Sequence, residues 1–308
     1  MKVEYKYWED NKGFEEKQAK IYNENNPGPQ PVTAEQIIER YKREEIDPKT
    51  VRYAFSEEGE LLAYIQARDY TQIKETHLGY PWAISSCPEK VQHKLFDEML
   101  DYIKQREKAN EFKIRMNASI QQNKVLDFFK MKDLQVKLKT YRFNLDIKKI
   151  GNSKYSESEY TTRLATNDDL DSLVNLLKAD GRYTGQFSSD NDIVSYFKDR
   201  VLKDGHTIIV FKDDELVMAS APLIYKLPND GDKESLIMRF HSFIKGNESA
   251  FEPLLIALAK ECVHTNYGID KLLAIFAAGD DDEFISIIEK YDPEKIVNGF
   301  SFGLEELD

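Results

Sequence analysis

The sequence has few of the residues that build metal centres and disulfide frameworks. Among 308 residues there are two cysteines, Cys87 and Cys262, and five histidines. No His-x-x-x-His or Cys-x-x-Cys pair occurs, so we expect neither a metal cofactor nor a fold held by disulfides. Two unpaired thiols favour a reducing, cytoplasmic compartment.

Excess positive charge and long apolar runs are also missing. Lys and Arg number 43 against 55 Asp and Glu, which gives a net charge of −12. Binding to nucleic-acid phosphates needs clustered cations, so a nucleic-acid partner is not expected. No apolar run approaches the roughly 18 residues of a membrane span, and the acidic first residues do not form a signal peptide. A P-loop motif is absent as well.

What the chain does contain is a repeat of its apolar pattern at an offset of roughly 156–159 residues. The matching stretches, first half and then second half, are 37–41 and 193–197, 51–55 and 208–211, 61–67 and 216–220, 95–99 and 254–258, 112–118 and 271–277, and 128–129 and 287–288. A register kept through successive elements predicts two similar domains, residues 1–148 and 161–308. The polar, Gly- and Ser-containing stretch 149–160 is the predicted linker.

Each half reads as strand, helix, helix, three strands, helix, strand, helix and one or two further strands. The two later helices indicate parallel crossovers beside an antiparallel meander. This order resembles the GNAT superfamily of acyl-CoA-dependent N-acyltransferases. The expected fold class is therefore α/β (α+β), with two tandem GNAT-like domains, each a mixed, partly antiparallel sheet flanked by helices.

The resemblance implies a binding loop for the pyrophosphate of acetyl-CoA between the fourth strand and the third helix. In the family this loop reads Gln/Arg-x-x-Gly-x-Gly/Ala, and its backbone N–H groups bind the phosphates. Here the glycine positions fall on residues 90–92 and 249–251, which contain no glycine. The residues expected at the co-substrate are Ile84, Ser85, Lys90, Val91, Gln92, His93, Asn123, Phe243, Ile244, Asn247, Ser249 and Ala250. The alternative for Lys90 and His93 is the solvated face of a helix that begins near Pro88.

The family's catalytic groups have only partial counterparts. The tyrosine that protonates the leaving thiolate is replaced by Phe129 and Ile288, although Tyr141 or Tyr291 could substitute from nearby. Candidates for the base that deprotonates the amine are Glu75, His77 and His241, on the fourth strand of each half. The alternative for each histidine is a packed or hydrogen-bonded strand residue.

Three further features allow two interpretations. The acidic run 280–283 either holds an amine or caps a helix, with Asp280 as the N-cap. The strand 272–278 is apolar throughout, which predicts burial on both faces. Cys87 stands near a helix start that would lower the pKa of its thiol, so it is a candidate nucleophile.

The resemblance implies transfer of an acyl group from acetyl-CoA to an amine of a small molecule or peptide. The missing glycines and tyrosines leave an alternative, which is a catalytically silent GNAT-fold protein that binds or regulates. The partners expected are acyl-CoA and an amine, with no nucleic acid and no membrane. Which half is active, and the oligomeric state, are not indicated by the sequence.

Overall fold

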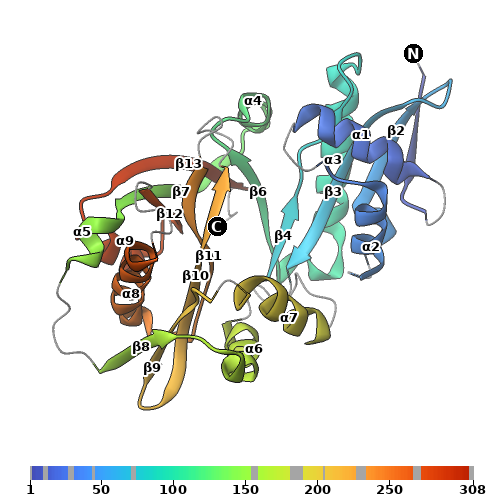
Figure 1. The fold of residues 1–308 in the computed structure, drawn as a ribbon. Coiled ribbons are helices and arrows are strands. Elements are labelled where there is room, and N and C mark those ends of the chain that lie inside the picture. Colours follow the sequence, from blue (N-terminus) through green and yellow to red (C-terminus); the bar gives the residue numbers. More distant parts are fainter. Residues whose placement is uncertain are drawn as a thin grey trace. The chain divides into compact units, whose positions relative to one another are not determined.

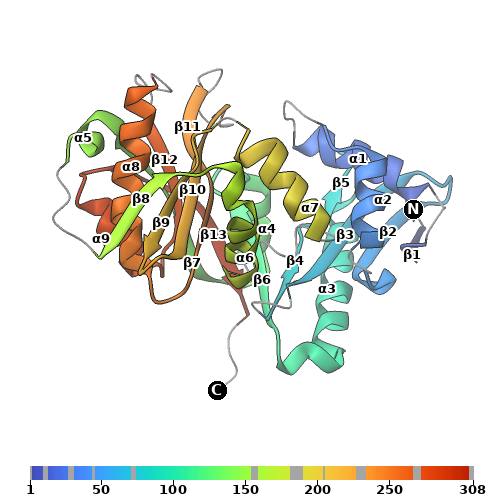
Figure 2. The ribbon, with the colours of Figure 1, turned by 60° about the horizontal axis from the view of Figure 1, so that its bottom comes forward.

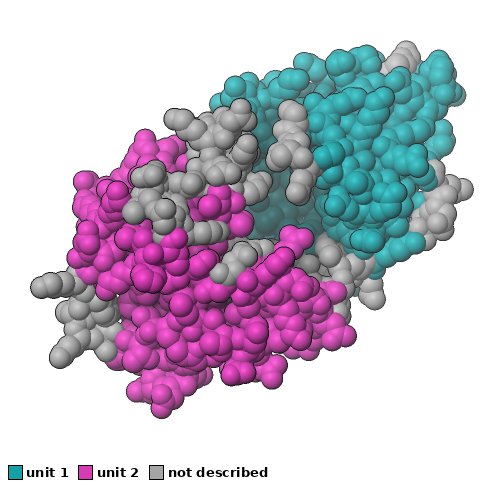
Figure 3. All heavy atoms as spheres, in the orientation of Figure 1, with its two compact units in different colours: residues 1–137, 300–308 teal, residues 138–299 magenta. Residues whose placement is uncertain are grey.

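The computed structural model describes residues 2–9, 13–26, 31–43, 46–70, 74–153, 159–180, 190–203, 205–226, 234–265 and 272–304 (Figures 1 and 2). The chain forms two compact units (Figure 3): unit 1 consists of Met1–Lys137 and Phe300–Asp308, and unit 2 of Leu138–Gly299. Each unit has its own cores, and one hydrogen-bonded strand order runs through both units.

Unit 1 is a mixed sheet with helices on both faces. Its elements are β1 (Val3–Tyr7), α1 (Phe14–Asn25), α2 (Ala34–Arg43), β2 (Val51–Ser56), β3 (Leu61–Tyr70), β4 (Glu75–Leu78), β5 (Trp82–Ala83), α3 (Glu89–Gln105), β6 (Lys113–Ser119), α4 (Asn123–Met131) and the end of β13 (Glu294–Gly303). The strand order is β1-β2-β3-β4-β6, followed by β13. Helices α1 and α2 pack on one core, which contains Tyr41 and Tyr53. Helices α3 and α4 pack on the other, which contains Phe96 and Phe129.

Unit 2 repeats this plan. Its elements are β7 (Gln135–Asp146), α5 (Ile147–Gly151), β8 (Tyr160–Leu164), α6 (Leu170–Asp180), α7 (Asp190–Tyr196) with the π-helix Phe197–Val201, β9 (Ile208–Lys212), β10 (Glu215–Lys226), β11 (Glu234–Phe243), α8 (Phe251–His264), β12 (Leu272–Ala278), α9 (Asp282–Glu289) and β13. The strand order is β13-β7-β12-β11-β10-β9-β8. One core lies under α5, α8 and α9, and a second under α6 and α7. The predicted fold class is confirmed.

The compact units do not follow the division expected from the repeat. Strand β7 starts in unit 1 at Gln135 but pairs with β12 of unit 2 from Thr140 to Asp146. The predicted linker 149–160 begins inside α5, where Ile150 is fully buried in the core of unit 2. Residues 154–158 of that linker lie outside the described residues.

Local sequence signals explain several boundaries. Helix α2 begins with a capping box, because the backbone N–H of Gln36 donates to Thr33 Oγ1 over 3.3 Å and the backbone N–H of Thr33 donates to Gln36 Oε1 over 3.1 Å. The residue that corresponds to Thr33 in the second half of the repeat, Ser189, lies outside the described residues. The β9–β10 turn has Asp213 and Asp214 at φ values of 49° and 64°, as a two-residue hairpin turn requires.

The prediction that residues 272–278 are buried on both faces is wrong. In β12 the side chains of Leu272 and Phe276 are 48% and 44% exposed, whereas Ala274 is fully buried. The strand is therefore half-buried, with its apolar character continued onto the exposed face.

One charged pair of unit 2 gives a prediction for stability. The Arg163 guanidinium donates to both carboxylate oxygens of Asp169 over 2.6 and 2.7 Å, and Thr166 N adds a bond of 2.8 Å. These donors lower the pKa of the Asp169 carboxyl to about 2. Because the folded pKa lies below the unfolded value, the stabilisation is present above about pH 4 and disappears as the pH falls toward 2.

We therefore expect Asp169→Asn to lower the free energy of unfolding at pH 7 by about 1–2 kcal/mol, a figure reduced for the half-exposed arginine. Urea unfolding of both proteins between pH 7 and pH 2 measures this. The difference between them should shrink below pH 4. A difference that is constant across this range would contradict the account.

Candidate functional site

The first feature of the site is an opening in the sheet of unit 1. Strands β4 and β6 run parallel and pair only from Glu75 with Lys113 to His77 with Arg115. The chain then bulges at Gly79, whose N–H donates to Gln66 O over 2.8 Å, and continues as β5, which pairs with β3. A Cβ at Gly79 would lie 3.0 Å from Gln66 O, so glycine permits this close approach. Beyond the bulge the strand has left β6.

The cavity at this opening has a volume of about 630 Å³, and we call it the donor pocket. Its lining residues are Glu24, Asn25, Tyr80, Ala83, Ile84, Ser85, Cys87, Glu89, Gln92, His93, Lys124, Asp127, Phe128 and Met131. They come from the end of α1, from the strand after the bulge, from the first turns of α3 and from α4. The pocket therefore lies where a helix N-terminus meets the opened strand.

The donor pocket brings together some of the predicted co-substrate residues. Ile84, Ser85, Gln92 and His93 line it. Lys90 and Asn123 are exposed and are not among its lining residues, and Val91 is 1% exposed within the core. Every third or fourth residue of α3, beginning with Val91, points into the core because that face packs on the sheet.

Polar contacts fix the walls of the donor pocket. The Gln92 side-chain amide donates to Tyr80 Oη over 3.1 Å and to Pro81 O over 2.8 Å, which ties α3 to the strand after the bulge. The His93 ring stacks on Phe128 with centroids 4.9 Å apart. The Asn25 amide donates to Ala83 O over 3.0 Å and holds the end of α1 against the same strand.

Tyr80 is a residue that sequence reasoning missed. Phe129 is fully buried in the core and has no proton to give, and Tyr291 contacts Glu252 in unit 2. Tyr80 instead lines the donor pocket, and burial raises the pKa of its hydroxyl, which therefore stays protonated at neutral pH. The sequence signal that could have identified it is its position between Gly79 and Pro81, because glycine and proline mark a break in a strand.

A second pocket of unit 1 is lined by Gly79, the residue that precedes Tyr80 in the chain. This His77 pocket has a volume of about 260 Å³. Its lining residues are Arg40, Tyr41, Ile46, Gln66, Ala67, Arg68, Tyr70, His77, Leu78, Gly79 and Asn117. Gly79 lines this pocket and Tyr80 lines the donor pocket, so both cavities reach the bulge.

The predicted base residues of unit 1 form one network at the His77 pocket. His77 Nε2 lies 2.9 Å from Glu75 Oε2, and Arg115 Nε donates to Glu75 Oε1 over 3.1 Å. The Asn117 amide nitrogen lies 3.3 Å from His77 Nδ1. If this amide donates, the imidazole proton sits on Nε2 and faces the carboxylate, and Nδ1 carries the lone pair. Glu75 and Asn117 thus fix the orientation of the His77 ring, and Arg115 holds Glu75.

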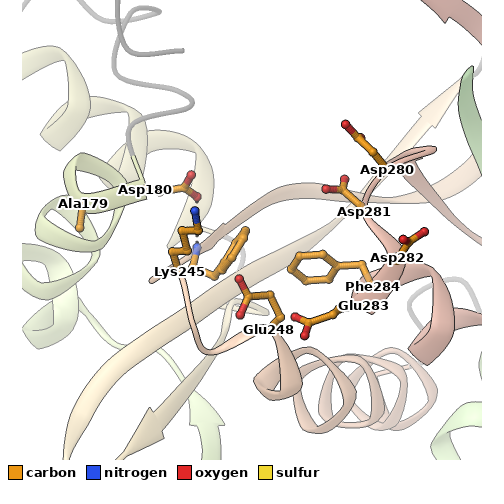
Figure 4. Close-up of a pocket in the computed structure, with 10 residues that line it drawn as sticks. Ala179, Asp180, Lys245, Glu248, Asp280, Asp281, Asp282, Glu283 and Phe284 are labelled. Carbon is orange, nitrogen blue, oxygen red and sulfur yellow. Dashed lines mark hydrogen bonds between the residues drawn. The ribbon is translucent and has the colours of Figure 1, made fainter. Parts of the chain in front are cut away.

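Unit 2 opens in the same way. Strands β11 and β12 pair in parallel only at Leu236–Ile237, after which β11 stays with β10 and β12 stays with β7. The pocket at this opening, which we call the acidic pocket, has a volume of about 430 Å³. Its lining residues are Ala179, Asp180, Phe243, Lys245, Glu248, Asp280, Asp281, Asp282, Glu283 and Phe284. Six carboxylates therefore surround one lysine and two phenylalanine rings (Figure 4).

Carboxylates also accept hydrogen bonds from backbone N–H groups at this opening. Gly246 N donates to Glu248 Oε1 over 3.2 Å, and Phe243 N donates to Asp180 Oδ2 over 3.1 Å. Asp180 is the last residue of α6 as Asn25 is the last residue of α1, and Glu283 is the second residue of α9 as Lys124 is the second residue of α4. The two openings are thus equivalent in position and differ in charge.

The predicted residues of unit 2 are mostly engaged within the fold. Phe243 lines the acidic pocket, whereas Ile244 N donates to Val217 O over 2.9 Å and Asn247 N to Ile244 O over 3.1 Å. The Ser249 hydroxyl lies 2.8 Å from Tyr160 Oη, and Ala250 is fully buried.

His241, the predicted base of unit 2, lies among aromatic rings. Its ring centroid lies 5.5, 5.0 and 4.9 Å from those of Phe243, Phe251 and Phe284. It is not among the lining residues of the acidic pocket. This environment is that of a packed residue, in contrast to the network around His77.

Two expectations about local chemistry are wrong. The N-cap of α9 is Asp281, which accepts from Ile285 N through its carbonyl, and not Asp280. Burial raises the pKa of the Cys87 thiol to about 11, so the helix start does not activate it. The stretch 299–303 fits the Gly-x-Ser-x-Gly pattern of hydrolases, but its Ser301 lies inside β13 and not at a strand-to-helix turn.

Solved structures share this architecture over almost the whole chain. A GCN5-related N-acetyltransferase from Sphaerobacter thermophilus matches 97% of this chain and 94% of its own, at 9% identity and a TM-score of 0.55. A tandem GNAT protein from the clavulanic acid biosynthesis pathway matches 98% of each chain, at 10% identity and a TM-score of 0.52. A probable N-acyltransferase from Enterococcus faecalis V583 matches 99% of this chain and 73% of its own, at 10% identity and a TM-score of 0.58.

The chain has the tandem GNAT fold. No family model matches the sequence, and no curated protein matches it significantly. At 9–10% identity the likeness concerns the fold alone. Among the described residues no helix is long and apolar enough to cross a bilayer, and no group of three or more His, Cys, Asp or Glu side chains is placed to hold a metal ion.

Proposed function

We propose that the protein is an N-acyltransferase that moves an acetyl group from acetyl-CoA to an amine, and that unit 1 binds the acetyl-CoA. The observation that carries the proposal is the pair of pockets that reach one bulge. The donor pocket and the His77 pocket meet consecutive residues, Gly79 and Tyr80. Such an arrangement lets two substrates approach one point of the sheet from separate cavities.

The residues of the donor pocket fit the co-substrate better than those of the acidic pocket. At the donor pocket α3 presents its N-terminus, with Ser85, His93 and Lys124 as donors to phosphate. Three carboxylates line this pocket, Glu24, Glu89 and Asp127, against six at the acidic pocket. At the acidic pocket Glu248 already takes the Gly246 N–H, and a pyrophosphate would face five further carboxylates. We therefore assign no acetyl-CoA to unit 2.

The chain's own residues have distinct tasks in this reaction. Acetyl-CoA supplies an activated thioester. His77, held by Glu75, takes a proton from the ammonium group of the acceptor, so that the free amine can attack the carbonyl carbon. Tyr80 stands in the donor pocket as the group that returns a proton to the thiolate. The C–N bond forms as the C–S bond breaks, and one proton is released to solvent overall.

Two measurements test the proposal. Calorimetry with acetyl-CoA measures binding, and release of free thiol with a panel of amines measures turnover. Binding together with amine-dependent thiol release supports the proposal. Binding without turnover supports the catalytically silent alternative. The absence of glycine at residues 90–92 favours that alternative. Absence of binding contradicts both. The cytoplasmic location stays a prediction.

A further inference from the structure

The His77 pocket carries a charge pattern that the transfer reaction itself does not need. Two arginines, Arg40 from α2 and Arg68 from β3, line it. No carboxylate is among its lining residues in the described part of the chain. In a protein with a net charge of −12, a pocket whose charged lining residues are arginines is a selective environment for anions.

The two guanidinium groups differ in how they are held. The Arg68 guanidinium lies 4.7 Å from the centroid of the Tyr70 ring and donates to its hydroxyl over 3.3 Å. The Tyr70 ring in turn packs on the His77 ring at 4.4 Å. Arg68, Tyr70 and His77 therefore contact one another in sequence along the pocket wall, which places a positive charge near the His77 ring.

Arg40 is half-buried and forms no ion pair with the residues that the structure describes. The neighbouring Tyr41 hydroxyl donates to Gln66 Oε1 over 3.2 Å and fixes another polar side chain of the same wall. A half-buried guanidinium without a carboxylate partner favours an anionic ligand, because it offers paired N–H donors in a fixed plane.

We propose that the acceptor is a small amine that also carries an anionic group, a carboxylate or a phosphate. The anionic group binds Arg40, on the wall that also carries Arg68, and this places the amine beside the His77 ring. A volume of about 260 Å³ suits a metabolite of amino-acid size. This inference rests on the proposed acyl transfer for its chemistry, but binding of the acceptor can be measured without it.

The test uses matched pairs of amines on the full chain. Each pair differs only in its anionic group: amino acids and their carboxamides, aminoalkyl phosphates and the corresponding amino alcohols. Diamines serve as cationic controls. We expect kcat/KM for thiol release to be at least about tenfold higher for the anionic member of the preferred pair. The better pair distinguishes a carboxylate from a phosphate.

The variant Arg40→Gln should remove most of that preference, while Lys42→Gln, an exposed lysine on the same helix, should keep it. Thermal unfolding checks that both variants are folded. If no amine is acetylated, calorimetry of the same panel without acetyl-CoA decides: binding of anionic amines that is lost in Arg40→Gln supports the inference. Equal rates or equal binding for neutral and anionic members, or no binding of any anionic amine, overturns it.

Discussion

Replacing His77 with glutamine is expected to lower kcat for acetyl transfer by about 100-fold, with little change in the affinity for acetyl-CoA. Removal of a positioned general base costs about 10²–10⁴ in rate. Glutamine keeps a polar side chain of similar reach but cannot accept the ammonium proton. His77 lines the acceptor side of the bulge and is not among the donor-pocket residues, so acetyl-CoA affinity should be unaffected. Steady-state kinetics and calorimetry measure the two quantities.

The matched control is His241→Gln in unit 2. Both histidines lie on equivalent strands, but His241 packs among phenylalanine rings. We expect His241→Gln to keep kcat and to change only stability. The kcat of Glu75→Gln should lie between those of His77→Gln and His241→Gln, because this change removes the carboxylate that orients His77 and leaves the imidazole in place. Full activity of His77→Gln together with loss of activity in His241→Gln would move the catalytic site to unit 2.

Much of the fold could be predicted because local sequence patterns specify the helices and strands. Apolar periodicity and hairpin turns, such as Asp213-Asp214, identify the helices and strands and their order. Because the pattern occurs in both halves of the chain, each half supports the assignment in the other. Domain boundaries could not be predicted in the same way. The pairing of β7 with β12 is a long-range contact, and so is the packing of α5 on α8, which buries Ile150. No local pattern specifies which strands will lie on either side of a given strand.

The candidate site was predictable only where one strand carries it. Glu75 and His77 point to the same face because they are two residues apart on β4, and the structure links them. Arg40, Arg68 and Asn117 come from three separate elements, so nothing in the sequence places them together. The aromatic surroundings of His241 likewise depend on α8 and α9. Tertiary packing, and not residue type, separates the two histidines.

Reversing the charge of Lys124 is expected to weaken acetyl-CoA binding by about tenfold or more, while the opposite reversal at Glu283 leaves it unchanged. Both residues stand in the first turn of the helix that borders the opening of their unit, α4 and α9. Lys124→Glu places a carboxylate where the donor pocket offers a cation to phosphate. A tenfold loss corresponds to about 1.4 kcal/mol, the size of one charge-assisted contact. Calorimetry gives the affinity and the number of sites together.

The wild-type chain should bind one acetyl-CoA, because the acidic pocket of unit 2 repels it. In Glu283→Lys that pocket still has Asp180, Glu248 and the run 280–282, so one site should remain and its affinity should match the wild type. Raising the salt concentration should reduce the difference between Lys124→Glu and the wild type, because exposed charges are screened. Two bound molecules per wild-type chain, or an equal loss of affinity in both variants, would show that unit 2 also takes the co-substrate, and the assignment to unit 1 alone would fail.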